Sequence, residues 1–136
     1  MKPSADFVLN TLRDEQLRKI FLRKLDILDG QIDIQKIITN KNIEQILTQV
    51  FFSEYLDFTF EYPHPINPLG QVMNPIKIVG VRGAYVVEED YVGINPKWNF
   101  FTTKRNAILY ANEAYKIFID KKNLREKSKG LKPYRN

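Results

Sequence analysis

The side chains that could carry acid–base or nucleophilic chemistry are few in this sequence. The chain has one histidine, His64, three serines and no cysteine. Histidine is the side chain whose unperturbed pKa lies near neutrality, so a Ser-His-Asp triad would have to use His64. It lies between Pro63 and Pro65, where no neighbouring residue orients its imidazole. The sequence predicts a non-enzymatic protein with no catalytic residue, no cofactor and no zinc site of histidine or thiolate ligands.

Two acidic clusters contain the carboxylate oxygens that hard cations prefer. The first is the run 88–90, Glu-Glu-Asp. Adjacent residues on a strand point to opposite faces, so at most two of these three carboxylates can converge. The second, Asp26, Asp29 and Asp33, lacks the alternate-position spacing of a calcium loop. We predict solvated turns and helix ends for both clusters, and no metal site.

Two further motifs have a nucleic-acid-binding alternative. Gly80-Val81-Arg82-Gly83 has the glycine spacing of the loop with which KH domains clamp a nucleic-acid backbone. That loop joins two helices, whereas β-branched runs flank these glycines, so we predict a bulge or tight bend. The segment 33–49 could form a helix-turn-helix, but its second helix offers no Lys or Arg outward. Ordinary helical packing is the prediction there.

The basic residues concentrate at the C-terminal end of the chain. Residues 121–136 have a net charge of +6 and the whole chain has +5, so residues 1–120 have −1. This asymmetry predicts that the tail binds an anionic partner and that the body has no basic face. The predicted binding residues are Lys121, Lys122, Arg125, Lys127, Lys129, Lys132 and Arg135.

Length and composition are those of one globular domain with a tail. The 136 residues are 43% hydrophobic, enough to bury roughly two-thirds of the surface of the unfolded chain. We predict a single domain over residues 1–120 and a basic tail over residues 121–136. The absence of cysteine and of a ~20-residue apolar run predicts no membrane segment and a cytoplasmic or other reducing intracellular compartment. The alternative is a component of a virion.

The N-terminal half has helical periodicity. Apolar residues recur at helical spacing from Ala5 to Leu28, and Gly30 stands where a left-handed C-terminal cap is expected. Two shorter helices are predicted from Ile34 to Thr39 and from Ile43 to Tyr55.

The C-terminal half changes to a period of two before a last helix. The predicted strands are Phe58–Tyr62, Ile76–Val81, Ala84–Glu88 and Lys97–Phe101, and a helix follows from Lys104 to about Lys121. The predicted fold is α+β: a helical N-terminal half, a small antiparallel sheet of three to four strands, one C-terminal helix packed on the sheet, and the basic tail.

The aromatic side chains of the strands have two interpretations. Phe58, Phe60 and Tyr62 share one strand face, and Trp98 lies on another strand. Exposed, they would form a stacking platform for bases, and such platforms normally lie in a basic groove. Because the body has a net charge of −1, we predict that these aromatics belong to the core.

The strands and the last helix also carry a family resemblance. Gly80–Arg82, Tyr85–Val87, Trp98, Phe101–Thr103, Ala107, Ala111 and Tyr115 follow its pattern. This third of the chain resembles the three-strand-plus-helix DNA-binding domains of plant ethylene-response factors and phage integrase arms. The resemblance implies a sheet that carries Arg and Trp into the major groove while the helix packs behind it. The sequence departs from the pattern where the acidic run 88–90 replaces basic residues.

These observations favour a protein that works by binding. We expect a non-catalytic structural or interaction component of a larger assembly, such as a ribonucleoprotein or a viral particle. Its body would dock on protein partners, and its tail would contact RNA, DNA or an acidic partner. The alternatives are a small nucleic-acid-binding regulator that uses the sheet face, and an accessory subunit of an enzyme.

Overall fold

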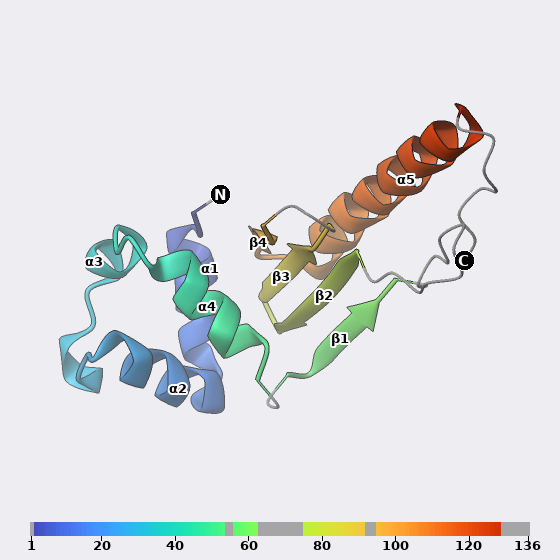
Figure 1. Cartoon of the computed structure of the whole chain (residues 1–136). Helices are drawn as coiled ribbons and strands as arrows, with labels where there is room; N and C mark the ends of the chain where they lie inside the picture. Colours follow the sequence, from blue (N-terminus) through green and yellow to red (C-terminus); the bar gives the residue numbers. More distant parts are fainter. Residues whose placement is uncertain (1, 54–55, 63–74, 92–94, 129–136) are drawn as a thin grey trace.

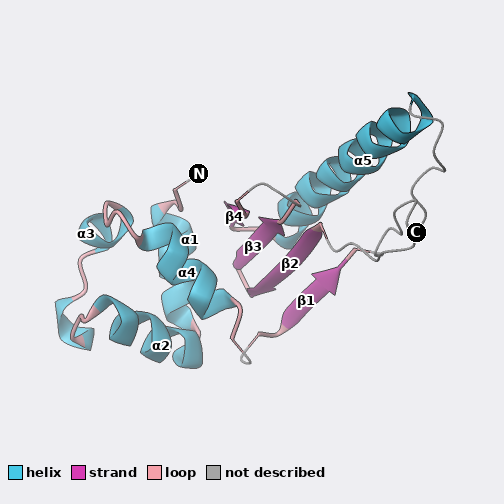
Figure 2. Ribbon diagram, viewed as in Figure 1, coloured by secondary structure: helices cyan, strands magenta, loops and turns pink. Residues whose placement is uncertain are grey.

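The computed structural model describes residues 2–53, 56–62, 75–91 and 95–128, the last seven of these by their backbone only. The fold is α+β, as the sequence predicts, and has three layers (Figure 1): an N-terminal group of helices, a sheet and a long C-terminal helix. Figure 2 shows the sheet between the two helical layers. The elements are α1 (Ala5–Arg13), α2 (Glu15–Leu25), the 3₁₀ turn η1 (Asp29–Gln31), α3 (Ile34–Ile38), α4 (Ile43–Phe51), β1 (Phe58–Glu61), β2 (Ile76–Val81), β3 (Ala84–Glu89), β4 (Lys97–Phe101) and α5 (Lys104–Ser128).

The first predicted helix is two helices, so the prediction of one continuous helix to Leu28 was wrong. Asp14 leaves the helical conformation, with φ −81° and ψ 121°, and its side chain accepts a hydrogen bond from the Leu17 amide. It therefore caps the start of α2 directly after α1 ends. The left-handed cap of α2 is Asp26, with φ 56°, and not Gly30, which lies in η1.

The N-terminal helices enclose the larger of two hydrophobic clusters. Phe7 of α1, Phe21 of α2 and Phe51 of α4 are each fully buried, and the rings of Phe7 and Phe51 lie 5.4 Å apart. The ring of Phe7 also meets Phe100 of β4 edge-on at 5.1 Å. The helical layer is therefore packed onto the sheet by aromatic contacts.

The four strands form one antiparallel sheet in the order β1-β2-β3-β4, at the four predicted positions. Alternate residues of the two central strands face opposite layers. Val79 and Val86 belong to the cluster under the helices, whereas Ile78 and Val87 pack under α5. Both faces of the central strands are therefore buried.

The β2–β3 hairpin turns on two residues, Arg82 and Gly83, as the prediction of a tight bend requires. Gly83 has φ +81°, a conformation that favours glycine, and the Asn10 amide donates a hydrogen bond of 2.7 Å to its carbonyl. A Cβ atom on Gly80 would lie 2.5 Å from the Ala84 carbonyl oxygen. The two glycines thus permit a close turn held against α1.

Helix α5 begins at a side-chain cap and crosses the sheet. Thr103 Oγ1 accepts a hydrogen bond from the Asn106 amide, and Ala107, Ala111 and Phe118 are buried, as the predicted apolar side requires. The helix runs through Ser128 and so crosses the predicted boundary between domain and tail at residue 121. Its C-terminal part extends past the sheet (Figure 1). Among the described residues, no helix is long and apolar enough to span a bilayer.

Candidate nucleic-acid interface

The predicted binding residues of the tail begin on the projecting end of α5. Lys121 is exposed there, three residues beyond Phe118, the last buried residue within 104–121, the part of α5 whose side chains the structure describes. Three more cations follow on helical backbone: Lys122, Arg125 and Lys127. Lys129, Lys132 and Arg135 lie outside the described residues. Four of the seven cations are thus carried by a helix and not by an extended tail.

The helix dipole favours cations at the C-terminal end of α5. The C-terminal end of a helix has a partial negative charge, so Lys and Arg in its last turns are favoured by roughly 0.3–1 kcal/mol each when exposed at low salt. Of the four cations, Arg125 and Lys127 lie in the last turn before Ser128, so this favourable term offsets only part of the repulsion between like charges that the helix holds close together. A concentrated positive field results, which attracts polyanions.

The acidic run 88–90 contains the main buried polar group that the sequence analysis missed. Glu89 is only 6% exposed, so the predicted solvated turn is wrong for this residue. Its carboxylate accepts hydrogen bonds of 2.8 Å from the Tyr91 hydroxyl, 2.8 Å from the Asn99 amide and 2.5 Å from the Tyr110 hydroxyl. We call these four residues the Glu89 network. It joins β3, β4 and α5 through one carboxylate.

The two phenols of the Glu89 network are strongly held in their neutral form. Burial raises the pKa of Tyr110 to about 12, and the hydrogen bond to Glu89 adds to the effect. The pKa of Tyr91 is raised in the same way, first by burial and then by Glu89. Tyr91 also stacks on Phe118 of α5, with ring centroids 5.3 Å apart. A carboxylate with three donors beneath a packed helix holds structure together, and its bonds are all internal.

A period-two pattern carries the signal for Glu89. Tyr85 and Val87 are buried under α5, and Glu89 is the next residue on the same face of β3. The neighbouring Glu88 points to the other face, where it accepts a hydrogen bond of 3.1 Å from the Trp98 indole. Alternation therefore separates the two carboxylates, as expected, but buries one of them.

The remaining candidate sites are structural or lie outside the described residues. Asp33 caps α3, Asp29 pairs with Arg18, and Asp26 ends α2, so the second acidic cluster forms helix ends, as predicted. Within the described ranges, no group of three or more His, Asp or Glu could hold a metal ion. His64 lies outside these ranges.

The sheet offers little surface to nucleic acid. Strands β2, β3 and β4 with α5 reproduce the three-strand-plus-helix arrangement that the resemblance implies, but α1 packs on the opposite sheet face. Trp98 packs against the helical core and Phe58 against the cluster under α5, as the core prediction requires. Phe60 is the exception, at 46% exposed. Comparison with known proteins found no matching family model, no matching curated protein and no matching solved structure.

Proposed function

We propose that this protein is a non-catalytic binding component of a larger assembly and that it holds a nucleic-acid backbone through the basic end of α5 and the residues that follow. The observation that supports the proposal most is the continuation of α5 beyond the sheet, because it places Lys121 and the backbone of the three cations that follow on a helix outside the body. Electrostatic contact with phosphates needs no pocket and no catalytic side chain.

The body supports this role by its packing. Both faces of the central strands are covered, and the buried carboxylate of Glu89 is saturated by internal donors. The described part of the domain is therefore a scaffold that fixes the direction of α5. The assembly partner of the body stays a prediction from the sequence.

The test is a salt titration of binding to a fluorescein-labelled 20-base-pair DNA duplex and to a single-stranded RNA of the same length. If four to six cations engage phosphates, the slope of log affinity against log salt should be roughly −4 to −5 on the duplex. The affinity should then fall by about 10² to 10³ between 50 and 200 mM salt. Measurement is by fluorescence anisotropy of the labelled strand.

Two variants locate the binding. Deletion of residues 121–136 should remove most of the affinity and most of the slope, and we expect the fold to remain, because Phe118 is the last buried residue among those whose side chains the structure describes. Replacement of the seven tail cations by Gln is the matched variant, because it keeps the length of the chain. Full affinity in both variants, or binding that ignores salt, contradicts the proposal.

A further inference from the structure

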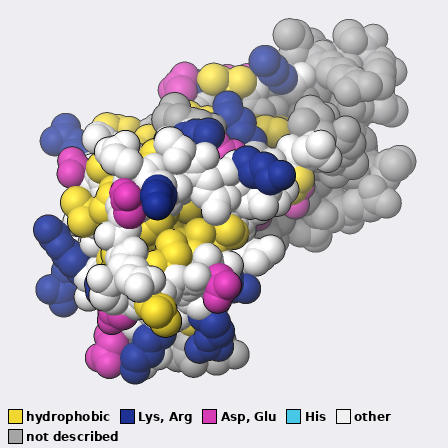
Figure 3. Space-filling view, turned by 90° about the vertical axis from the view of Figure 1, so that its left-hand side faces the viewer, with side chains coloured by type: hydrophobic (Ala, Val, Ile, Leu, Met, Phe, Trp, Pro, Cys, Tyr) yellow, Lys and Arg dark blue, Asp and Glu magenta, His cyan; other side chains and the backbone are white. Residues whose placement is uncertain are grey.

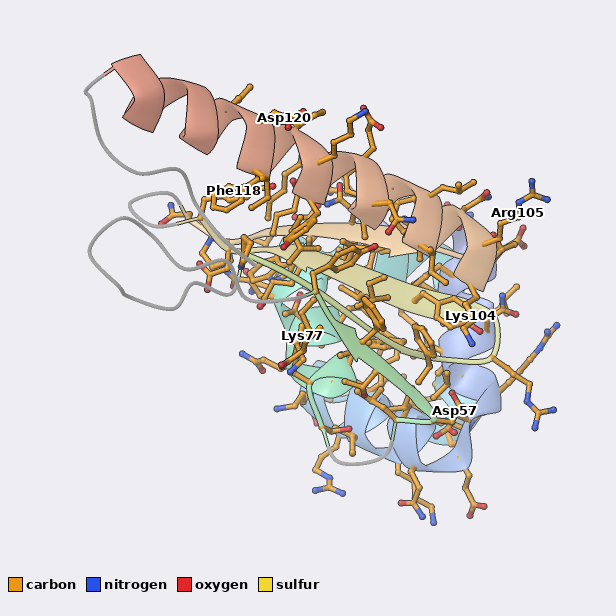
Figure 4. The ribbon with its side chains drawn as sticks, turned by 90° about the vertical axis from the view of Figure 1, so that its right-hand side faces the viewer. Asp57, Lys77, Lys104, Arg105, Phe118 and Asp120 are labelled. Carbon is orange, nitrogen blue, oxygen red and sulfur yellow. The ribbon has the colours of Figure 1, made fainter. Side chains whose placement is uncertain are left out.

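A second group of cations lies at the opposite end of α5, where the sheet has its β2–β3 turn. Arg82 forms this turn, Lys104 and Arg105 begin α5, and Arg13 ends α1. All four residues are exposed. We call them the hairpin-end cluster. Figure 4 shows Lys104 and Arg105 together at one end of α5, with Phe118 and Asp120 far along the helix.

The strand register brings these residues to the same end of the sheet. Tyr85 of β3 is paired with Gly80 on one side and with Phe101 on the other. The turn at Arg82 and the start of α5 at Lys104 therefore leave the sheet at the same edge. Adjacent strands are only about 4.8 Å apart, so long cationic side chains from this edge share one surface.

Specific contacts fix the backbone and side chains beneath the cluster. The hydrogen bond from Asn10 to the Gly83 carbonyl ties the turn to α1, and Arg13 follows Asn10 by one helical turn. The ammonium of Lys104 lies 4.1 Å from the centre of the Phe58 ring, a cation–π contact. The turn that carries Arg82 is thus hydrogen-bonded to α1, and the other three cations lie on α1 and α5.

The cluster has little negative charge to neutralise it. Within the part of the chain that the structure describes, neither Arg82 nor Arg105 forms an ion pair. Exposed carboxylates on the neighbouring elements include Asp57, before β1, and Asp6, on α1, against the four cations of the cluster. On the outer face of the helical layer, by contrast, Lys, Arg, Asp and Glu are interspersed (Figure 3). Exposed cations of one sign repel one another, so the hairpin-end cluster fits an anionic partner.

The cluster also lies at a useful distance from the proposed tail interface. Lys104 and Lys121 are separated by 17 residues of continuous α5, which is about 26 Å along the helix axis. Duplex DNA rises about 3.4 Å per base pair along each strand, so a partner of roughly eight base pairs or more can reach both ends.

We propose that the hairpin-end cluster is a second phosphate-binding surface and that one nucleic-acid duplex lies along α5, in contact with this cluster at one end and with the C-terminal end of the helix, from Lys121, at the other. This inference rests on the proposed function for the identity of the partner. Charge complementarity selects the duplex over an uncharged protein surface. The hairpin-end cluster is also a local basic surface on the body, which the net charge of −1 over residues 1–120 does not indicate.

The experiment compares double variants in the full-length chain on the same 20-base-pair duplex. Arg82→Gln with Arg105→Gln should make the salt slope less negative by about 2, because each lost phosphate contact removes about 0.9 from it. The matched control is Arg23→Gln with Lys24→Gln in α2, which removes two exposed cations of the helical layer. The control should leave the slope within about 0.5 of the parent protein.

The outcomes separate this inference from the proposed function. If the Arg82/Arg105 variant and the α2 control have the same slope while the tail variants lose binding, the second surface does not exist and the tail interface stands. If the Arg82/Arg105 variant loses two contacts while the tail variants bind fully, the hairpin-end cluster stands and the tail interface is wrong. Circular dichroism of each variant checks that the fold is retained, and a parent protein that does not bind the duplex overturns both.

Discussion

The two ends of the sheet differ in whether their charged side chains have partners within the protein. At the end where β3 finishes, Glu88 and Glu89 accept hydrogen bonds from Trp98, Tyr91, Asn99 and Tyr110, and Glu61 pairs with Lys77 at 3.5 Å. At the hairpin end, Arg82 and Arg105 have no ion-pair partner within the described residues. These three carboxylates thus have partners within the protein, although only Glu89 is buried, whereas the two arginines are exposed without an ion-pair partner among the described residues.

This difference separates charges that hold the fold from charges that are available to a partner. A buried carboxylate must be fully hydrogen-bonded, because an unsatisfied charge in the interior is costly. An exposed arginine has no such requirement, since water solvates it at little cost to the fold. We therefore expect changes at the Glu89 network to alter stability, and changes at the hairpin end to alter binding.

We expect the largest loss of stability from alkaline pH, which should destabilise the Glu89 network. Because the pKa values of Tyr91 and Tyr110 are raised in the folded state, the fold holds both phenol protons more tightly than the unfolded chain. Their stabilising contribution is complete below the ordinary pKa of 10.0 and is lost as pH rises through about 12, the pKa of Tyr110. The phenolate of Tyr110 would then face Glu89, and Tyr91, whose pKa is raised further, would follow at higher pH. Denaturant unfolding followed by circular dichroism at pH 9, 10, 11 and 12 measures this loss.

A double variant tests whether the two phenols of the Glu89 network are the cause. Tyr91→Phe with Tyr110→Phe removes both titrating hydroxyls, so its free energy of unfolding should depend less on pH between 10 and 12. The burial-raised pKa values of Tyr62 and Tyr115 leave part of the dependence in place. An unchanged pH profile in this variant shows that the network does not control alkaline stability.

Removal of the carboxylate itself should have the next largest effect. Glu89→Ala leaves Tyr91, Asn99 and Tyr110 without their acceptor, and unsatisfied buried donors cost about 1–3 kcal/mol each before relaxation. We expect a loss of about 2–4 kcal/mol in the free energy of unfolding, measured with urea.

The adjacent residue is the control for this change. Glu88→Ala removes one hydrogen bond, to the Trp98 indole, from a half-exposed side chain, so we expect a loss of about 0.5–1.5 kcal/mol. Equal losses at residues 88 and 89 contradict the distinction between a buried network and a single surface contact.

The sequence predicts most of the architecture because periodicity reports burial directly. The four strands and the buried side of α5 follow from apolar residues at spacings of two and of three to four. The break at Asp14 was missed because the apolar pattern continues across it, from Leu12 to Leu17. Hydrophobic spacing records which residues are buried and does not record where a single side chain caps a new helix.

The two charged ends could not be predicted for a different reason. The cations of the hairpin-end cluster come from α1, the β2–β3 turn and α5, so only the fold brings them together. A net charge of −1 over residues 1–120 is a sum, and a sum hides any local excess. Glu89 was misjudged because a run of three acids resembles a solvated turn, although alternation with Val87 already indicates burial.

The smallest expected effect completes the comparison: the hairpin-end cations should contribute almost nothing to stability. Arg82→Gln with Arg105→Gln removes no ion pair within the described residues, and both residues are exposed. We expect the free energy of unfolding to change by less than about 0.5 kcal/mol in urea at neutral pH. The sign should favour the variant at low salt, because two like charges are removed from beside Lys104 and from the positive end of α5. That small gain should vanish at about 1 M salt, where the Debye length is only about 3 Å. A loss of 1 kcal/mol or more would mean that these arginines hold the fold together, and the contrast between the two ends of the sheet would then fail.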